Sequence, residues 1–377
     1  MSAAGIFWSA VGVVAYTYAG YPLLIAGMAR LHPAARREPD ATEQTPRVSV
    51  VMSAYNEAAR LPAKLRNLRE LAYPRDRLAI VVVSDGSTDG TERVAQGEPG
   101  VHVVVSRQRR GKAHALNLAM REVHGDIVVF CDLRQELDAV AVRRLVDELR
   151  DPSVGVASGE LMHRPGATAT GRSIGLYWRY EKWIRKSESR LYSTVGATGA
   201  LYAMRRADWR DLREGTILDD FENPMQVVRR GKRAVLASQA LAWDTLQEDS
   251  AIEKRRKIRT LSGNFQSFAA NPWLFSPLAN PVWFQFVSHK VLRLLVPYAL
   301  LVALAASLAA SGWMYRAAFA LQALFYLMAG AGRWIPSSRR SRLVSFAHVF
   351  VDMNLAAVLA LLRFAGGDAD AKWEKTS

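Results

Sequence analysis

Cysteine is almost absent from this chain, which has a single one, Cys131, in 377 residues. One thiol excludes an intramolecular disulfide and a cysteine-based zinc site, and it fits a reducing compartment. Because Cys131 lies in an apolar run, we expect it to pack as a small hydrophobe. Carboxylates are also few beside the cations, with 35 Asp and Glu against 50 Lys and Arg and a formal net charge of +15. This excess favours anionic partners.

A nucleic-acid-binding module is lacking as well. The basic residues scatter over several loops and form no recognisable module, so we expect no nucleic acid partner. The anions that remain are membrane lipids and phosphorylated small molecules. The length suits roughly two to three folding units.

Long apolar runs are confined to the two ends of the chain. The first, at residues 6–28, carries no charge and is long enough to cross a bilayer. No basic region precedes it, so we expect a retained helix rather than a cleaved signal peptide. Three further runs lie at residues 294–310, 317–331 and 346–362. The last contains Asp352 and Asn354, which should face neighbouring helices; a buried helix of a soluble fold is its alternative.

Basic residues beside these runs predict a topology. They follow the first run and precede the last, at Arg30, Arg36, Arg37, Arg333, Arg339, Arg340 and Arg342. Both loops should be cytoplasmic, which four crossings with the N-terminus outside would satisfy. We therefore expect an integral protein of the bacterial inner membrane in three parts. These are a helix and polar linker at 1–44, a cytoplasmic domain at 45–275, and an interfacial helix (280–290) with about three membrane helices at 276–377.

The middle of the chain has the pattern of an α/β domain. Short β-branched runs typical of buried parallel strands occur at residues 48–52, 79–83, 101–105 and 127–130. A helical stretch at 58–71 places Leu61, Leu65 and Leu68 on one face. Strands that alternate with helices predict a doubly wound sheet, in which ligands bind beyond the carboxyl ends of the strands.

Polar residues follow these strands at that edge. Residues 53–57 read SAYNE and residues 84–91 read SDGSTDGT. The second segment alone is typical of a turn that caps a helix, but two such clusters offer acceptors for a base and a ribose, and Tyr55 could stack on a ring. The segment RQRRGKAHALN at 107–117 is either a surface basic loop or a phosphate-contacting one, through Gly111 and Lys112. It lacks the spacing of a P-loop.

Asp132 follows the fourth strand, in the segment CDLRQ. A carboxylate at this place is suited to holding a divalent cation that bridges two phosphates. Such a cation would neutralise the charge that builds on a diphosphate leaving group.

Seven ordered segments together resemble glycosyltransferase family 2, the inverting group that includes cellulose, chitin and hyaluronan synthases. Spread over roughly residues 46–270, they read VSVVMSAYNE, VVVSDGSTDGT, GKAHALN, FCDLRQ, GATGALYAMRR, LDDFENPMQVVRRGKRAVL and EKRRKIRTLSGNFQ. The resemblance implies a GT-A-like α/β domain flanked by transmembrane helices. It also implies a nucleotide-sugar donor, with UDP favoured over GDP, and Mg²⁺ or Mn²⁺ as cofactor.

The same resemblance assigns roles to individual residues. The nucleotide-sugar site would comprise Tyr55, Glu57, Asp85, Lys112, Asp132, Arg134 and Arg259, with Asp132 as the metal ligand. Gly199 and Arg256 would lie on the acceptor side. Asp219 and Asp220 take the place of the family's Glu-Asp pair, whose second member is the general base. Inversion needs one such carboxylate to deprotonate the acceptor, so we expect Asp220 to be that base. The alternative is that the pair caps the following helix.

Two departures from the family pattern shape the expected activity. Arg134 stands where the DxD motif has its second carboxylate, and it could neutralise diphosphate directly. The Gln-x-x-Arg-Trp segment of processive synthases reads RKIRT at 256–260. We therefore expect transfer of one or a few sugars to a lipid-linked or saccharide acceptor in envelope or extracellular polysaccharide synthesis. The alternatives are a processive synthase coupled to export and a catalytically silent membrane subunit, and the oligomeric state stays open.

Overall fold

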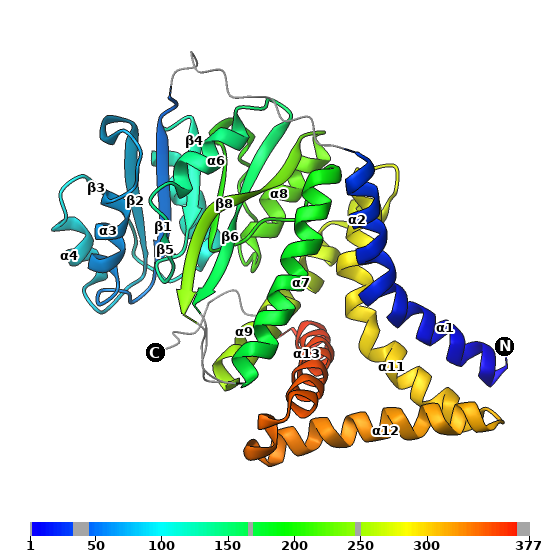
Figure 1. The fold of residues 1–377 in the computed structure, drawn as a ribbon. Coiled ribbons are helices and arrows are strands. Elements are labelled where there is room, and N and C mark those ends of the chain that lie inside the picture. Colours follow the sequence, from blue (N-terminus) through cyan, green and yellow to red (C-terminus); the bar gives the residue numbers. More distant parts are fainter. Residues whose placement is uncertain (1, 33–44, 165–168, 246–249, 368–377) are drawn as a thin grey trace.

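One eight-stranded sheet forms the centre of the protein. The computed structural model describes residues 2–32, 45–164, 169–245 and 250–367. The strand order is β3-β2-β1-β4-β7-β6-β8-β5. The strands are β1 Val48–Ala54, β2 Leu78–Asp85, β3 Val101–Ser106, β4 Ile127–Cys131, β5 Glu136–Leu137, β6 Val154–Arg164, β7 Leu201–Arg205 and β8 Arg233–Thr245. Figure 1 shows this sheet beside a group of long helices.

The first half of the sheet is parallel, as the sequence predicts. Val48 of β1 pairs with Leu78 of β2 on one side and with Ile127 of β4 on the other, and β2 pairs in parallel with β3. All seven residues of β1 are buried. Burial on both faces explains why the run is continuously apolar instead of alternating. The four predicted strands are confirmed, each extended by one to three residues.

The second half of the sheet is mixed. Strand β7 runs antiparallel to both β4 and β6, while β6 and β8 pair in parallel. The doubly wound pattern therefore holds for β1 to β4 only. The chain leaves β6 through the long helix α7 (Ala169–Leu191) and returns as β7 in the opposite direction.

Helices cover both faces of the sheet. They are α3 Leu61–Arg69, α4 Thr91–Gln96, α5 Lys112–Glu122, α6 Ala141–Leu149, α8 Asp219–Arg229 and α9 Ser250–Ala270. On one face Leu61, Leu65 and Leu68 pack with Val50 of β1. Helices α5 and α8 pack on the other face. Helix α3 begins three residues later than the predicted 58–71, because the amide of Leu61 closes a turn on the carbonyl of Glu57.

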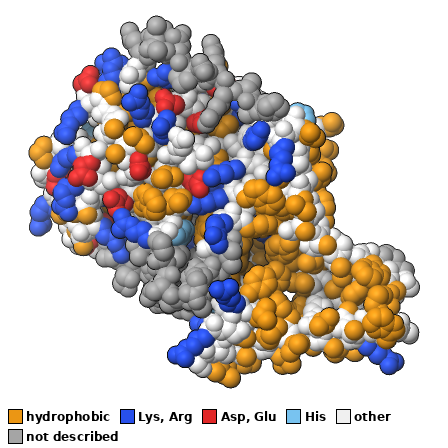
Figure 2. All heavy atoms as spheres, viewed as in Figure 1, with side chains coloured by type: hydrophobic (Ala, Val, Ile, Leu, Met, Phe, Trp, Pro, Cys, Tyr) orange, Lys and Arg blue, Asp and Glu red, His pale blue; other side chains and the backbone are white. Residues whose placement is uncertain are grey.

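Three helices in the described part of the chain are long and apolar enough to cross a membrane: Ala3–Leu31, Trp283–Ala309 and Arg342–Ala365. The first joins α1 Ala3–Ala15 and α2 Tyr21–Leu31, the second joins α10 Trp283–Gln285 and α11 Leu292–Ala309, and the third is α13. In each of the first two, a short π-helical turn connects the two α-helical segments: Tyr16–Gly20 in the first and Phe286–Val291 in the second. In Figure 2 apolar side chains are densest over these helices, and charged ones gather over the sheet domain.

The expectation of four crossings stays a prediction, because three of the described helices are long and apolar enough to cross a membrane. The run at 317–331 does form a helix, α12 (Trp313–Trp334), but Arg316 and Arg333 bracket its apolar part. The residues between them span roughly 24 Å at ~1.5 Å per residue, short of a hydrocarbon core of ~30 Å. Figure 1 shows α12 lying across the ends of α11 and α13. The orientation of the helices in a membrane stays a prediction.

One further expectation about these ends differs from the structure, and a second concerns residues that the structure does not describe. The interfacial helix expected at 280–290 is not separate, since Trp283–Ala309 is one continuous helix. The linker at 36–44, with Arg36 and Arg37, lies outside the described residues. By contrast, Asp352 of α13 does face a neighbouring helix, because its carboxylate lies 3.8 Å from the guanidinium of Arg333 on α12. The thiol of Cys131 is buried and free, as expected.

Candidate active site

The loops that follow β1 and β2 are tied together at the carboxyl edge of the sheet. The side-chain oxygen of Asn56 accepts from the amide of Thr88 at 2.7 Å, and the amide of Glu57 donates to the hydroxyl of Thr91 at 2.8 Å. The ring of Tyr55 has the guanidinium of Arg109 over it, 3.9 Å from its centroid. Glu57 also pairs with Arg60 at 3.2 Å. The polar clusters at the two strand ends thus form one surface, as predicted.

Asp85 anchors the basic loop to this surface. It is 2% exposed, and its two carboxylate oxygens accept from the backbone amides of Arg110 and Gly111 at 2.9 and 2.7 Å. The next residue, Gly86, has φ +67°, and a Cβ there would lie 2.5 Å from the amide nitrogen of Arg109. Only glycine permits this close approach. Asp85 therefore holds the start of α5 next to the strand ends.

Lys112 is the first residue of α5 and connects two other elements. Its ammonium lies 3.1 Å from a carboxylate oxygen of Asp132, after β4, and 3.1 Å from one of Asp219, at the start of α8. Burial alone would lower the pKa of Lys112, but the charges of Asp132, Asp219 and Asp220 outweigh it and raise the pKa above its usual value. Lys112 is thus a permanent cation between the aspartates.

Asp219 and Asp220 begin α8, but neither is its N-cap. Leu218 occupies that position without a side-chain cap, so the capping interpretation of the pair is wrong. The carboxylate of Asp219, 4% exposed, accepts from the hydroxyl of Tyr202 at 3.1 Å as well as pairing with Lys112. Burial first, and then the Asp219 charge, raise the pKa of Asp220 to about 6.

Gly199 lies directly against Asp220. A Cβ at this glycine would lie 2.8 Å from a carboxylate oxygen of Asp220, and the amide of Ala197 donates to the Asp220 carbonyl at 2.7 Å. Asp220 is partly exposed, and no described side chain forms a hydrogen bond or ion pair with its carboxylate. The predicted acceptor segment and the predicted base are therefore adjacent, and that carboxylate is available to a ligand.

Arg134 does not point at the aspartates that Lys112 joins. Its guanidinium pairs at 2.6 Å with Asp244, a β8 carboxylate that is 6% exposed and also accepts from Gln135 at 2.9 Å. Asp244, Tyr202 and Arg109 are not among the site residues expected from the sequence. Tyr202 and Arg109 stand in the quoted segments GATGALYAMRR and RQRRGKAHALN, but nothing in those segments indicates their contacts, which join residues distant along the chain. Asp244 stands outside the quoted segments.

Arg256 and Arg259 lie on α9, behind the start of α8. A Cβ at Gly263 of α9 would lie 2.7 Å from the Leu218 side chain, so the two helices approach closely just before Asp219. Both arginines are partly buried. Their predicted contacts with donor and acceptor stay predictions.

The described residues contain no group of three His, Cys, Asp or Glu side chains placed to hold a metal ion. Asp132 nevertheless fits the usual magnesium arrangement, in which one or two carboxylates and the substrate phosphates share the ion. Its side chain is 43% exposed, and Lys112 takes only one of its two oxygens. Arg134 cannot supply the second carboxylate.

Family models match most of the region that carries this site. A model of Glycosyl transferase family 2 matches residues 49–212, and one of Glycosyl transferase family group 2 matches residues 131–355, more than half of the chain. The chain belongs to glycosyltransferase family 2. This confirms the resemblance expressed by the seven motifs.

Curated relatives and one solved structure agree with the family. The probable glycosyltransferase YdaM of Bacillus subtilis is 25% identical over 59% of this chain and 56% of its own length. An N-acetylglucosaminyltransferase of Azorhizobium caulinodans is 30% identical over 45% of each chain. The chain thus spans about half the length of these relatives.

The structural likeness extends over the whole molecule. The mannosyltransferase PcManGT of Pyrobaculum calidifontis, solved in complex with GDP-Man and Mn²⁺, is 27% identical with a TM-score of 0.71. The match covers 96% of this chain and 99% of that one. The GT-A-like fold with flanking apolar helices is confirmed by this match.

Proposed function

We propose that this family 2 member is an inverting glycosyltransferase that moves a sugar from a nucleoside-diphosphate donor to an acceptor presented at a membrane. The observation that carries the proposal is the junction at the start of α8. There a partly exposed carboxylate, Asp220, lies beside a buried cation, Lys112, that also reaches the strand-end carboxylate Asp132.

Asp220 supplies the base. With its pKa raised to about 6, the carboxylate is largely ionised at neutral pH yet basic enough to accept a proton. It takes the proton of an acceptor hydroxyl as that oxygen bonds to the anomeric carbon, and the bond to the diphosphate breaks on the opposite face. Asp219 stays bound to Tyr202 and Lys112 and so keeps the first turn of α8 in place.

The donor occupies the carboxyl edge of β1, β2 and β4. The Tyr55–Arg109 pair and the loop that Asp85 anchors lie where the base and ribose bind, and Lys112 faces the diphosphate. Asp132 would hold a divalent cation, which when bound neutralises charge on the leaving group. Metal-bound neighbours of the same fold, such as PcManGT with Mn²⁺, support this role. UDP and GDP sugars are both candidate donors, since PcManGT binds GDP-Man.

The apolar helices support an acceptor that is presented at a membrane. Ala3–Leu31, Trp283–Ala309 and Arg342–Ala365 expose large apolar side chains such as Leu301 at 58% and Leu362 at 63%. Exposed apolar surface of this extent favours lipid over water. We infer membrane anchoring with the sheet domain on the cytoplasmic side, and an acceptor that is lipid-linked or a saccharide.

The test is release of nucleoside diphosphate by the detergent-purified full chain. A panel of UDP- and GDP-sugars is screened with Mg²⁺, with Mn²⁺ and with EDTA. We expect metal-stimulated release from one donor and a loss of ~100-fold or more in Asp220→Asn, with nucleotide binding retained.

The matched control is Glu222→Gln, which removes a carboxylate from the same first turn of α8. It should keep most of the activity. Turnover at the wild-type rate in Asp220→Asn would remove Asp220 from the role of base. A wild-type protein that binds no nucleotide sugar would instead favour the silent membrane subunit.

A further inference from the structure

A second group of charged residues lies where α7 meets the apolar helices. Its centre is Arg185 of α7. One guanidinium nitrogen donates to the hydroxyl of Thr198 at 2.5 Å and the other to the hydroxyl of Ser158 at 3.0 Å. Thr198 immediately precedes Gly199, the residue in contact with Asp220. Arg185 is thus fixed one residue away from the acceptor segment.

No carboxylate in the described part of the chain forms an ion pair with Arg185. The neighbouring carboxylates are already used. Glu160 takes Lys182 and Lys186 at 3.1 and 3.2 Å. The hydroxyls of Ser158 and Thr198 orient the guanidinium without neutralising it, so its charge is held ready for an anion.

Lys290 supplies a second cation at the same place. It lies in the π-helical turn Phe286–Val291, within the helix Trp283–Ala309. Its charge reaches Asp220, where it opposes the rise in the pKa of that carboxyl, and it also interacts with Arg185. Lys290 is partly buried, and in the described residues its ammonium has neither a hydrogen bond nor an ion pair.

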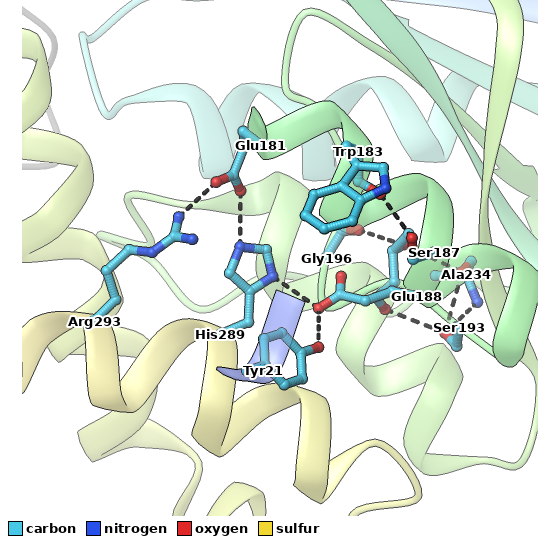
Figure 3. A network of polar contacts seen from close by, with 11 residues as sticks. Tyr21, Glu181, Trp183, Ser187, Glu188, Ser193, Gly196, Ala234, His289 and Arg293 are labelled. Carbon is cyan, nitrogen blue, oxygen red and sulfur yellow. Dashed lines mark hydrogen bonds and ion pairs between the residues drawn. The ribbon is translucent and has the colours of Figure 1, made fainter. Parts of the chain in front are cut away.

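The charges of Glu181 and Glu188 act on Lys290, and both carboxylates contact other groups directly. Figure 3 shows these direct contacts. Glu188 accepts from Tyr21 at 2.6 Å and contacts one nitrogen of His289 at 2.8 Å. Glu181 contacts the other nitrogen of His289 at 2.9 Å and pairs with Arg293. This network joins α2, α7 and the helix that carries Lys290, and neither glutamate forms a direct ion pair with the Lys290 ammonium.

Arg185 and Lys290 are partly buried cations that form no direct ion pair with a carboxylate of the described residues, so an anion bound between them would stabilise both. A phosphate suits this pair, because arginine offers a planar donor fork and lysine a compact charge. Because the pair lies beside Asp220 and at the base of the apolar helices, we expect the phosphate to be that of a lipid. Its apolar chain would then lie against the helices and its sugar hydroxyl near the base.

We propose that Arg185 and Lys290 form the binding site for the phosphate of a lipid-linked acceptor. The inference rests on the proposed function and deepens it by naming the acceptor class. In the transfer, the acceptor hydroxyl oxygen bonds to the anomeric carbon and its proton passes to Asp220. The bond between the anomeric carbon and the donor diphosphate breaks, and the nucleoside diphosphate leaves with the electron pair.

The test compares binding of farnesyl phosphate, farnesol and a short-chain phosphatidylglycerol to the detergent-purified full chain. A saturating amount of nucleoside diphosphate is present throughout, so that the donor site cannot take the probe. We expect farnesyl phosphate to bind about tenfold or more tightly than farnesol. Arg185→Gln and Lys290→Gln should each remove most of that preference, and Lys290→Arg should restore it.

Lys186→Gln is the matched control, since it removes an exposed cation of α7 that pairs with Glu160. It should keep the preference. Equal binding of farnesyl phosphate and farnesol, or a preference that survives both substitutions, would overturn the proposal. Phosphatidylglycerol binding as tightly as farnesyl phosphate would assign the site to a bilayer headgroup and overturn the acceptor assignment. Donor hydrolysis is measured on the same samples. If the wild type hydrolyses the donor but shows no preference for farnesyl phosphate, the acceptor site fails while the proposed function stands.

Discussion

Exchanging Asp219 for asparagine should move the acid limb of the pH–rate profile to lower pH. The pKa of Asp220 rises from the ordinary 3.8 to about 6, and burial is the larger cause, with the Asp219 charge second. Asp219 therefore contributes part of a rise of about two units, which corresponds in full to about 3 kcal/mol. The substituted amide keeps a side-chain oxygen for Tyr202, so the shape of the site is retained.

The sign follows from the role of Asp220 as a base. The wild type is active when that carboxylate is ionised, so its rate falls as the pH drops through about 6. Without the Asp219 charge, ionisation of Asp220 becomes easier and the fall in rate moves to a pH below 6. The measurement is kcat/KM for release of nucleoside diphosphate between about pH 4.5 and 8. Thermal unfolding of each sample at each pH separates titration from loss of fold.

Lys112→Met provides the opposite sign in the same assay. Lys112 is the foremost cause that lowers the pKa of Asp220. Its removal should raise the acid limb above pH 6, in addition to weakening donor binding. If the acid limb moves to lower pH in Asp219→Asn and to higher pH in Lys112→Met, the electrostatic account of the site is supported. If Asp219→Asn leaves the limb unmoved or raises it, the titrating group is not Asp220 and the reasoning fails.

Two further substitutions test other parts of the site. Gly199→Ala should reduce kcat about tenfold or more while leaving donor binding intact. The reason is that a Cβ 2.8 Å from the Asp220 carboxylate must displace that carboxylate. Unchanged kcat with an unchanged fold would contradict the contact. Arg134→Ala should lower the melting temperature, because it leaves the buried Asp244 carboxylate without its cation, at a cost of ~3–5 kcal/mol. The donor KM should stay unchanged. A raised donor KM would instead place Arg134 on the diphosphate.

The sequence alone predicts the parallel half of the fold and much of the site. Continuous β-branched runs identify β1 to β4 because those strands are buried on both faces. Residues after parallel strands necessarily meet at one edge, which is why Tyr55, Asp85 and Asp132 come together as expected. The resemblance to the family then adds Asp219 and Asp220, and their proximity to Lys112 is known from the structure alone.

The remainder depends on contacts that local patterns do not encode. The place of β7 between β4 and β6 is set by pairing between segments some 70 residues apart, such as Phe130 with Tyr202. The role of Asp244 likewise appears only when β8 brings it to Arg134. Hydropathy finds apolar runs but does not weigh the arginines that bracket α12 against the thickness of a bilayer. For that reason a fourth crossing, at α12, stays a prediction.

Helix α7 links the apolar helices to the base, and this linkage bears on where the acceptor can react. Tyr180 donates to the carbonyl of Tyr18 at 2.9 Å and Glu188 accepts from Tyr21, so α7 is bonded along the N-terminal helix. On the same helix Arg185 donates to Thr198, next to the glycine that touches Asp220. A rigid helix rises ~1.5 Å per residue, so these contacts hold the base at a fixed distance from the apolar surface. The proposed lipid-linked acceptor would then present its hydroxyl at one height relative to the apolar surface, as a single, well-placed carboxylate requires.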